Sequence, residues 1–165
     1  LTPIMSPTGH FHIKNVIKKH NPLLAGEMSG HIFFNDKWHG FDDGHYSGAR
    51  IIELISNNKK SISAINNDLP NLFSTPELNI TVNDETKFQI IEDFSMKCNL
   101  KGEKINIDVL RINFKNGWGL LRASNTTPKL VMRFEGNTED DLKEIQNNFL
   151  HELSRICPNI DINLD

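Results

Sequence analysis

Residues 111–134 read RINFKNGWGLLRASNTTPKLVMRF, in which three apolar segments alternate with two polar turns. The first turn contains Asn116-Gly117, a pair that reaches the positive φ angles of a tight hairpin at little steric cost. The second turn is the polar run at 122–128, where Pro128 stiffens the exit. Apolar segments on either side of such turns predict neighbouring antiparallel strands.

Helical patterns flank these strands. Residues 86–97 place apolar side chains at helical spacing, and Asn137-Thr138 can cap a final helix over 139–156. The alternation of Ile80 and Val82 predicts one more strand. An antiparallel sheet with two helices on one side fits this order, which places the second part of the chain in the α+β class.

The first part of the chain predicts a small, mixed α/β piece. A helix over 9–19 ends at Pro22, a buried strand covers 32–34, and Asp42 or Asp43 caps a second helix. The predicted apolar face of that second helix is Ala49, Ile51, Ile52, Leu54 and Ile55.

The boundary between the two parts falls in the stretch 66–76. This stretch is polar and contains two prolines, which stop helices. We therefore expect one domain at 1–68, a second at 77–165 and a hinge at 69–76.

Composition excludes several classes of protein. A net charge of −3 argues against a nucleic-acid partner, since nonspecific binding needs a basic face. The apolar runs are too short to span a membrane, and the start of the chain has no signal core. Two cysteines do not make a disulfide framework. We expect a cytoplasmic protein with no membrane partner.

The loop Gly26-Glu27-Met28-Ser29-Gly30-His31 is the first candidate site. Glycines at both ends let the backbone turn sharply and approach a ligand. Glu27 and Ser29 can then face the same way, and a carboxylate beside a hydroxyl suits a pair of sugar hydroxyls. His31 adds a group that titrates near neutral pH. The alternative is an ordinary turn with a solvated glutamate.

The second candidate is the loop at 122–128. Arg122 offers a planar fork for phosphate oxygens, and the turn backbone can present further N–H donors. The alternative is a polar turn with a surface arginine. The short donors that would complete a phosphate site are Ser124, Asn125 and Thr126.

A metal site is the weakest candidate. His10 and His12, completed by His31 or Asp42, form the one grouping with ligand chemistry, and no cysteine or histidine spacing typical of zinc sites supports it. We therefore expect no metal site in this chain.

Both loops resemble those of a known family. The loop at 26–31, followed by Phe41-Asp42-Asp43-Gly44, resembles the sugar-binding loop in the third domain of the α-D-phosphohexomutases, the phosphomannomutase/phosphoglucomutase family. Thr8-Gly9-His10 resembles the turn before that loop. Residues 117–128 resemble the phosphate-binding loop of the fourth domain. The resemblance implies the C-terminal part of a mixed α/β third domain, then a fourth domain with an antiparallel, TATA-box-binding-protein-like sheet and helices.

The resemblance also implies an activity. Members of the family are isomerases that interconvert hexose 1-phosphate and hexose 6-phosphate through a hexose 1,6-bisphosphate, with a phosphoserine and Mg²⁺. His10 and His31 would then lie near the sugar as the catalytic histidines. Glu27 and Ser29 would bind the sugar, and the phosphate would be bound by Arg122, Ser124, Asn125 and Thr126.

Two family loops have no counterpart in this sequence. The nucleophile loop reads Thr-Ala-Ser-His-Asn-Pro and the magnesium loop reads Asp-Gly-Asp-x-Asp-Arg in the family, and neither occurs here. We expect a C-terminal fragment that is inactive alone and works with the missing N-terminal domains. The alternative is a stand-alone, non-catalytic module that binds phosphosugars. Preference for mannose or glucose stays open.

Overall fold

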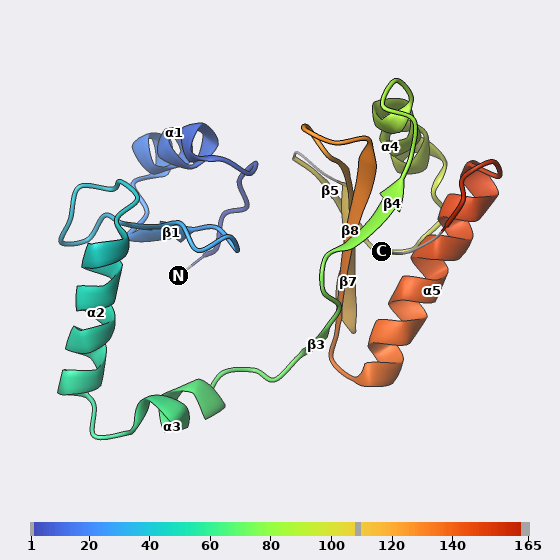
Figure 1. Cartoon of the computed structure of the whole chain (residues 1–165). Helices are drawn as coiled ribbons and strands as arrows, with labels where there is room; N and C mark the ends of the chain where they lie inside the picture. The colour runs from blue at the N-terminus through green and yellow to red at the C-terminus, as the bar shows by residue number, and fades with distance from the viewer. Residues whose placement is uncertain (1, 108–109, 163–165) are drawn as a thin grey trace. The chain divides into compact units, whose positions relative to one another are not determined.

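A computed structural model describes residues 2–107 and 110–162 (Figure 1). The chain divides into two compact units, Leu1–Pro70 and Asn71–Asp165, which are described separately below. Among the described residues, no helix combines the length and the apolar character that crossing a membrane requires.

The first unit is a hairpin with helices around it. Its elements are α1 (His10–His20), β1 (Leu24–Gly26), β2 (Ile32–Phe34), α2 (Gly44–Asn57) and α3 (Ile62–Asn67). The strands β1 and β2 pair antiparallel, with Leu24 opposite Phe34. The buried core consists of Ile13, Ile17 and Phe33. The unit is therefore held by a very small apolar cluster.

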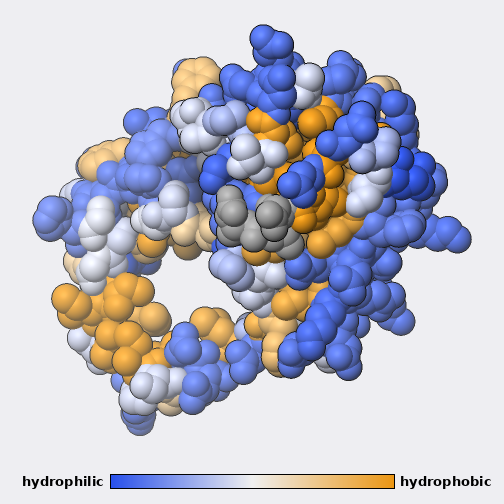
Figure 2. Space-filling view, turned by 45° about the vertical axis from the view of Figure 1, so that its right-hand side comes forward, coloured by the Kyte–Doolittle hydropathy of each residue, from blue (hydrophilic) through white to orange (hydrophobic). Residues whose placement is uncertain are grey.

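The cap predicted for α2 is confirmed, but its predicted apolar face is not buried. The Asp43 carboxylate accepts a hydrogen bond from the Tyr46 N–H at 2.9 Å, as an N-cap does. Ile52 is 65 % exposed, and hydrophobic side chains gather on the surface over α2 (Figure 2). The amphipathic pattern is present, but residues 2–70 provide no layer that covers it.

The second unit is a six-stranded antiparallel sheet in the order β3-β8-β7-β6-β5, with β4 also paired to β8. Helices α4 and α5 lie on one face of it (Figure 1). This arrangement confirms the predicted α+β class. The elements are β3 (Phe73–Ser74), β4 (Leu78–Thr81), α4 (Lys87–Lys97), β5 (Glu103–Asn106), β6 (Leu110–Phe114), β7 (Gly117–Ala123), β8 (Lys129–Gly136) and α5 (Glu139–Ile156).

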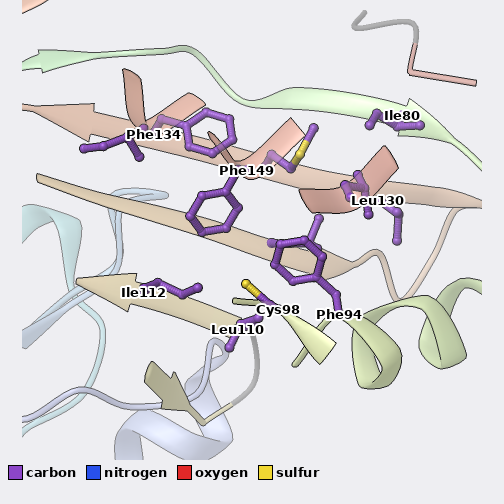
Figure 3. Close-up of a cluster of buried hydrophobic side chains, with 12 residues drawn as sticks. Ile80, Phe94, Cys98, Leu110, Ile112, Leu130, Phe134 and Phe149 are labelled. Atoms are coloured by element: carbon purple, nitrogen blue, oxygen red, sulfur yellow. The ribbon is translucent and has the colours of Figure 1, made fainter. Parts of the chain in front are cut away.

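Aromatic rings fill the space between the sheet and its helices (Figure 3). The Phe149 ring of α5 lies 5.7 Å from the Phe94 ring of α4 and 5.3 Å from the Phe134 ring of β8, centroid to centroid. All three rings are essentially inaccessible to solvent. Gly119 of β7 makes room for Phe149, because a Cβ at this position would lie 2.4 Å from Phe149 Cε2.

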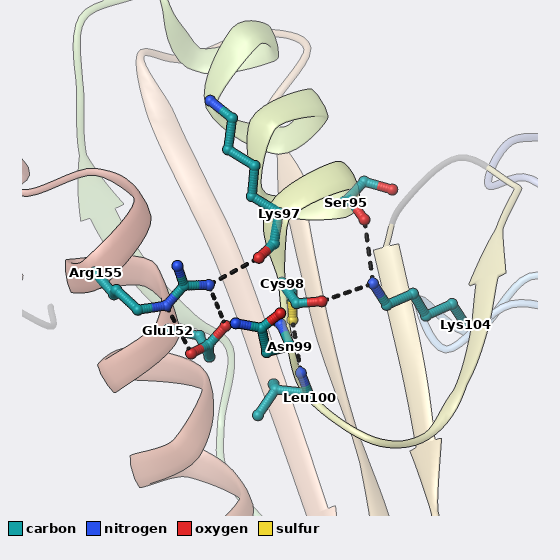
Figure 4. A network of polar contacts seen from close by, with 8 residues as sticks. All are labelled: Ser95, Lys97, Cys98, Asn99, Leu100, Lys104, Glu152 and Arg155. Carbon is teal, nitrogen blue, oxygen red and sulfur yellow. Dashed lines mark hydrogen bonds and ion pairs between the residues drawn. The ribbon is translucent and has the colours of Figure 1, made fainter.

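A charged network closes the C-terminal end of α4 against α5 (Figure 4). The Glu152 carboxylate accepts hydrogen bonds from the Asn99 N–H at 2.8 Å and from both Nε and Nη2 of Arg155, at 2.9 and 2.7 Å. Arg155 Nη2 also donates to the Lys97 carbonyl at 2.7 Å. The hydrogen bond from Arg155, followed by that from Asn99, lowers the pKa of Glu152 to about 2 despite its burial.

We expect Gly119→Ala to lower the free energy of unfolding of the second unit by about 1–3 kcal/mol, because the added methyl group overpacks the core against Phe149. Urea unfolding of the full chain measures this. Gly48→Ala is the matched control, since the methyl group added there would meet no neighbouring atom within 4 Å and helix α2 favours alanine. Equal stability of the two variants would contradict the packing argument.

Glu152→Gln is expected to destabilise the chain at pH 7 by roughly 1.5–3 kcal/mol, the range for hydrogen bonds to charged groups. A carboxyl group with a lowered pKa stabilises the folded state above its unfolded pKa of about 4.3, and this contribution disappears as the pH falls towards the folded value. The stability difference between wild type and variant should therefore shrink between about pH 5 and pH 2. A difference that stays constant over this range would refute the assignment.

Candidate functional site

The loop between β1 and β2 is a closed turn. The Glu27 N–H donates to the His31 carbonyl at 2.9 Å, and the Gly30 N–H donates to the Glu27 carbonyl at 3.0 Å. Gly30 has a φ of 92°, a left-handed conformation that favours glycine. Gly26 lies in strand β1 without such a conformation, so only the second glycine is required by backbone geometry.

Glu27 is partly engaged by the chain itself. Its Oε1 accepts a hydrogen bond from the Gly9 N–H at 2.7 Å, just before the first turn of α1. A carboxylate at this position is favoured by the helix dipole. One carboxylate oxygen is thus already used within the chain. Ser29 is exposed, and its hydroxyl has no hydrogen-bond partner among the residues that the structure describes.

His10 and His31 meet at Asp42. His31 Nδ1 lies 2.7 Å from Asp42 Oδ2, His10 Nε2 lies 3.5 Å from the same oxygen, and the ring centroids are 4.4 Å apart. Asp42 Oδ1 accepts a hydrogen bond from the Ile32 N–H at 3.0 Å. The hydrogen bond with His31, aided by that from Ile32, lowers the pKa of Asp42. An ionised Asp42 only accepts, so His31 carries its proton on Nδ1 and leaves Nε2 for a ligand.

Sequence reasoning missed this use of Asp42. It considered Asp42 as a helix cap or a metal ligand, whereas Asp43 is the cap of α2. The signal for this role was the pair of consecutive aspartates before one helix. A helix start needs only one capping residue, so the other aspartate is available for a different contact.

The second loop joins β7 to β8 and is organised around Ser124. The Ser124 N–H donates to the Lys129 carbonyl at 2.9 Å, in register with the strands. Ser124 Oγ accepts hydrogen bonds from the Thr126 N–H at 3.4 Å, the Thr127 N–H at 3.2 Å and Thr127 Oγ1 at 2.7 Å. The residue is buried, so its hydroxyl shapes the turn and keeps a single proton to donate. Asn125 and Thr126 are exposed.

Arg122 lies at the end of β7 with a side chain that is 34 % exposed. Its Nη2 is 3.5 Å from Glu77 Oε2, a loose contact that leaves most of the guanidinium donors available. A pocket of about 530 Å³ opens beside it, lined by Arg122 and Asn125 together with apolar side chains of α4 such as Phe88 and Met96.

The buried side chain of Lys87 contacts this loop, and the sequence analysis did not single it out. Its side chain is 4 % exposed, its Nζ donates to the Thr127 carbonyl at 3.1 Å, and it pairs with Asp84 at 2.6 Å. A cation in the first turn of a helix is disfavoured by the helix dipole. That unfavourable position, in a helix whose first turn lacks any acidic residue, is the signal that could have identified Lys87.

The candidate residues therefore form two sets, one in each unit. Within the described part of the chain, the one grouping of three metal-ligating side chains is His10, Glu27 and His31. Mg²⁺ is bound by oxygen ligands, so this nitrogen-rich set does not fit it.

Two family models match the chain. Phosphoglucomutase/phosphomannomutase, alpha/beta/alpha domain III, matches residues 1–73. Phosphoglucomutase/phosphomannomutase, C-terminal domain, matches residues 77–152.

Individual relatives agree with these models. The chain is 48 % identical over 161 residues to a phosphomannomutase/phosphoglucomutase of Pseudomonas syringae pv. tomato, covering 97 % of this chain and 35 % of that protein. It is 50 % identical over 149 residues to a phosphoglucomutase of Neisseria meningitidis serogroup A, covering 88 % of this chain and 32 % of that protein. The chain thus spans about a third of the length of these curated relatives.

A solved structure agrees as well. The crystal structure of a phosphoglucomutase/phosphomannomutase family protein from Burkholderia thailandensis matches with a TM-score of 0.85 and 41 % identity, over 95 % of this chain and 33 % of that one. The predicted family is thereby confirmed: the chain belongs to the phosphoglucomutase/phosphomannomutase family.

Proposed function

We propose that this chain is the C-terminal, substrate-binding part of a phosphomannomutase/phosphoglucomutase, an isomerase that interconverts hexose 1-phosphate and hexose 6-phosphate. The observation that carries the proposal is the loop after Arg122. Ser124 Oγ accepts hydrogen bonds that close the turn, and the buried ammonium group of Lys87 donates to the Thr127 carbonyl. The Arg122 guanidinium lies at the start of the loop and has donors that its contact with Glu77 does not use. Such a loop is an anion site whose shape exists before the anion arrives.

The phosphate that does not react would be held by this loop. Arg122 presents a planar fork that matches two phosphate oxygens. Asn125 and Thr126 offer exposed donors, and Ser124 has one proton left to donate. Holding the distant phosphate orients the other end of the sugar, and phosphoryl transfer depends strongly on such positioning.

The sugar would be held by the loop of the first unit. The carboxylate oxygen of Glu27 that Gly9 does not use can accept from sugar hydroxyls, and the Ser29 hydroxyl can donate to or accept from them. His10 and His31 would lie near the sugar. One of them would assist proton transfer, with Asp42 fixing the orientation of His31.

The remaining chemistry would come from domains that carry the phosphoserine and Mg²⁺ loops, whether on the same polypeptide or on another. The described residues do not fit Mg²⁺, so we assign no step through it to them; they contribute binding and orientation. A hexose 1,6-bisphosphate is the expected intermediate, and the cytoplasm is the expected location.

The domain assignment follows the same proposal. We place the sugar-binding portion at 1–68, the phosphate-binding domain at 77–165 and the hinge at 69–76. The pairing of β3 with β8 favours residues 69–72 as the part of that segment that changes conformation, since Phe73 and Ser74 are held by the sheet.

Arg122→Ala is expected to weaken binding of glucose 1-phosphate by about tenfold to a hundredfold, the loss for a charge-assisted hydrogen-bonded pair. NMR titration of the labelled full chain, followed at the amides of Ser124 to Thr126, measures it. Lys143→Ala is the matched control, because it removes an equally positive, exposed group on α5. Equal weakening by both variants would indicate a net-charge effect and reject the phosphate site.

The same titration separates the two loops. Glu27→Ala should leave the response of the Ser124 loop to inorganic phosphate intact. It should abolish the additional shifts in the 26–31 loop that we expect with glucose 1-phosphate or mannose 6-phosphate.

Lys87→Met should weaken phosphate binding by about tenfold, because the Thr127 carbonyl loses its donor and the loop loses the hydrogen bond that holds its shape. The amide shifts of Thr126 and Thr127 should already differ from wild type before phosphate is added. Urea unfolding confirms that the variant is folded. An unchanged loop spectrum together with unchanged affinity would show that Lys87 has no part in the site.

A further inference from the structure

Three side chains of the first unit offer ligand atoms that all lie within 4.8 Å of one another: His10, Glu27 and His31. His10 is the first residue of α1, and the other two come from the β1–β2 loop. We propose that these residues form a binding site for a transition-metal dication of the zinc class, distinct in chemistry from any magnesium site.

The donor set matches this class of ion. Two imidazole nitrogens and one carboxylate oxygen are typical zinc ligands, with bonds of about 2.0–2.2 Å and an open fourth position for water. The histidine side chains are 44 and 45 % exposed. Small rotations of such exposed rings can bring the three donors to the roughly 3.4 Å mutual separation that tetrahedral coordination requires.

Two of the three proposed ligands, His31 and Glu27, already have hydrogen-bond partners outside the group of three. Asp42 Oδ2 holds His31 Nδ1 at 2.7 Å, and Asp42 is itself fixed by the Ile32 N–H at 3.0 Å. Glu27 Oε1 accepts from the Gly9 N–H at 2.7 Å. Metal-binding histidines and carboxylates commonly have such partners, which fix the orientation of the ligand and the free nitrogen of the ring.

The site is also anchored to the core of its unit. The His10 ring packs edge-on against the ring of Phe33, with centroids 5.3 Å apart, and Phe33 is fully buried. Phe33 forms a β-bridge with Asp42, so His10 and the outer carboxylate are both tied to the same buried residue. Preorganised ligands lose less entropy on binding an ion.

The structure groups different residues from those that the sequence suggested. Positions two apart on a helix do not face each other, so His10 and His12 do not form a pair. Glu27 takes the place of His12 in the set. His12, on the same helix but outside the group, therefore provides a natural control.

One consequence rests on the proposed function. Glu27 and His31 are residues that the proposal assigns to the sugar. An ion bound to them would occupy the place of the sugar hydroxyls, so zinc and the hexose would compete.

The test is a calorimetric titration of the full, untagged, reduced and metal-stripped chain with Zn²⁺, followed by Co²⁺ as a spectroscopic probe. We expect one equivalent to bind, and His10→Gln and His31→Ala to weaken binding by at least about tenfold. Asp42→Asn should weaken it by about tenfold, as loss of an outer-shell partner does. Bound Co²⁺ should give visible ligand-field bands without a thiolate charge-transfer band.

His12→Ala and Cys157→Ser are the controls, and both should leave the affinity within about twofold of wild type. Cys157 is tested because it is a free thiol with partial exposure. The proposal is overturned if wild type binds no zinc, or if either control abolishes binding while His10→Gln does not.

No sugar phosphate enters that titration, so failure of the proposed function cannot affect its result. A second titration, with glucose 1-phosphate in excess, tests the competition. A lowered zinc affinity there would support it, whereas an unchanged affinity would reject the competition and leave the metal site standing.

Discussion

Strand β8 is hydrogen-bonded along both of its edges, and the second unit is built on this constraint. Seven residue pairs join it to β7, and β4 and β3 occupy its other edge. Side chains that alternate along β8 enter the core beneath α4 and α5. Because β7 and β8 are aligned in this way, the chain between them must turn within a few residues. The loop geometry around Ser124 is thus a product of strand register as much as of its own sequence.

The first unit is stabilised differently. Among residues 2–70, its buried apolar core is the cluster of Ile13, Ile17 and Phe33. The loop at 26–31 and the start of α1 are therefore joined largely by polar contacts, from Glu27 to Gly9 and from His31 to Asp42. A region with few buried apolar contacts opens more readily than a packed sheet. The residues that we assign to the sugar accordingly lie in the more adaptable unit, whereas those assigned to the phosphate lie on a rigid one.

Sequence reasoning succeeded where the signal is local. The helix over 139–156, the hairpin at Asn116-Gly117 and a cap at Asp42 or Asp43 are each set by residues close together in the chain. The structure has all three, with Asp43 as the cap. Contacts across long separations could not be predicted. Lys87 reaches Thr127, 40 positions away, and Glu27 reaches Gly9, 18 positions away. The exposed face of α2 shows the same limit, because an amphipathic pattern predicts a buried face without specifying what covers it.

The proposed phosphate site depends on a weak ionic contact of Arg122. Its contact with Glu77 spans 3.5 Å between two partly exposed side chains, a kind of pair that contributes about 0–1 kcal/mol in water. On the proposed function, a phosphate that replaced Glu77 would form a bidentate, charge-assisted contact, which is stronger than the pair it would displace. The weakness of this ion pair is therefore what would let a phosphate displace Glu77 at little energetic cost.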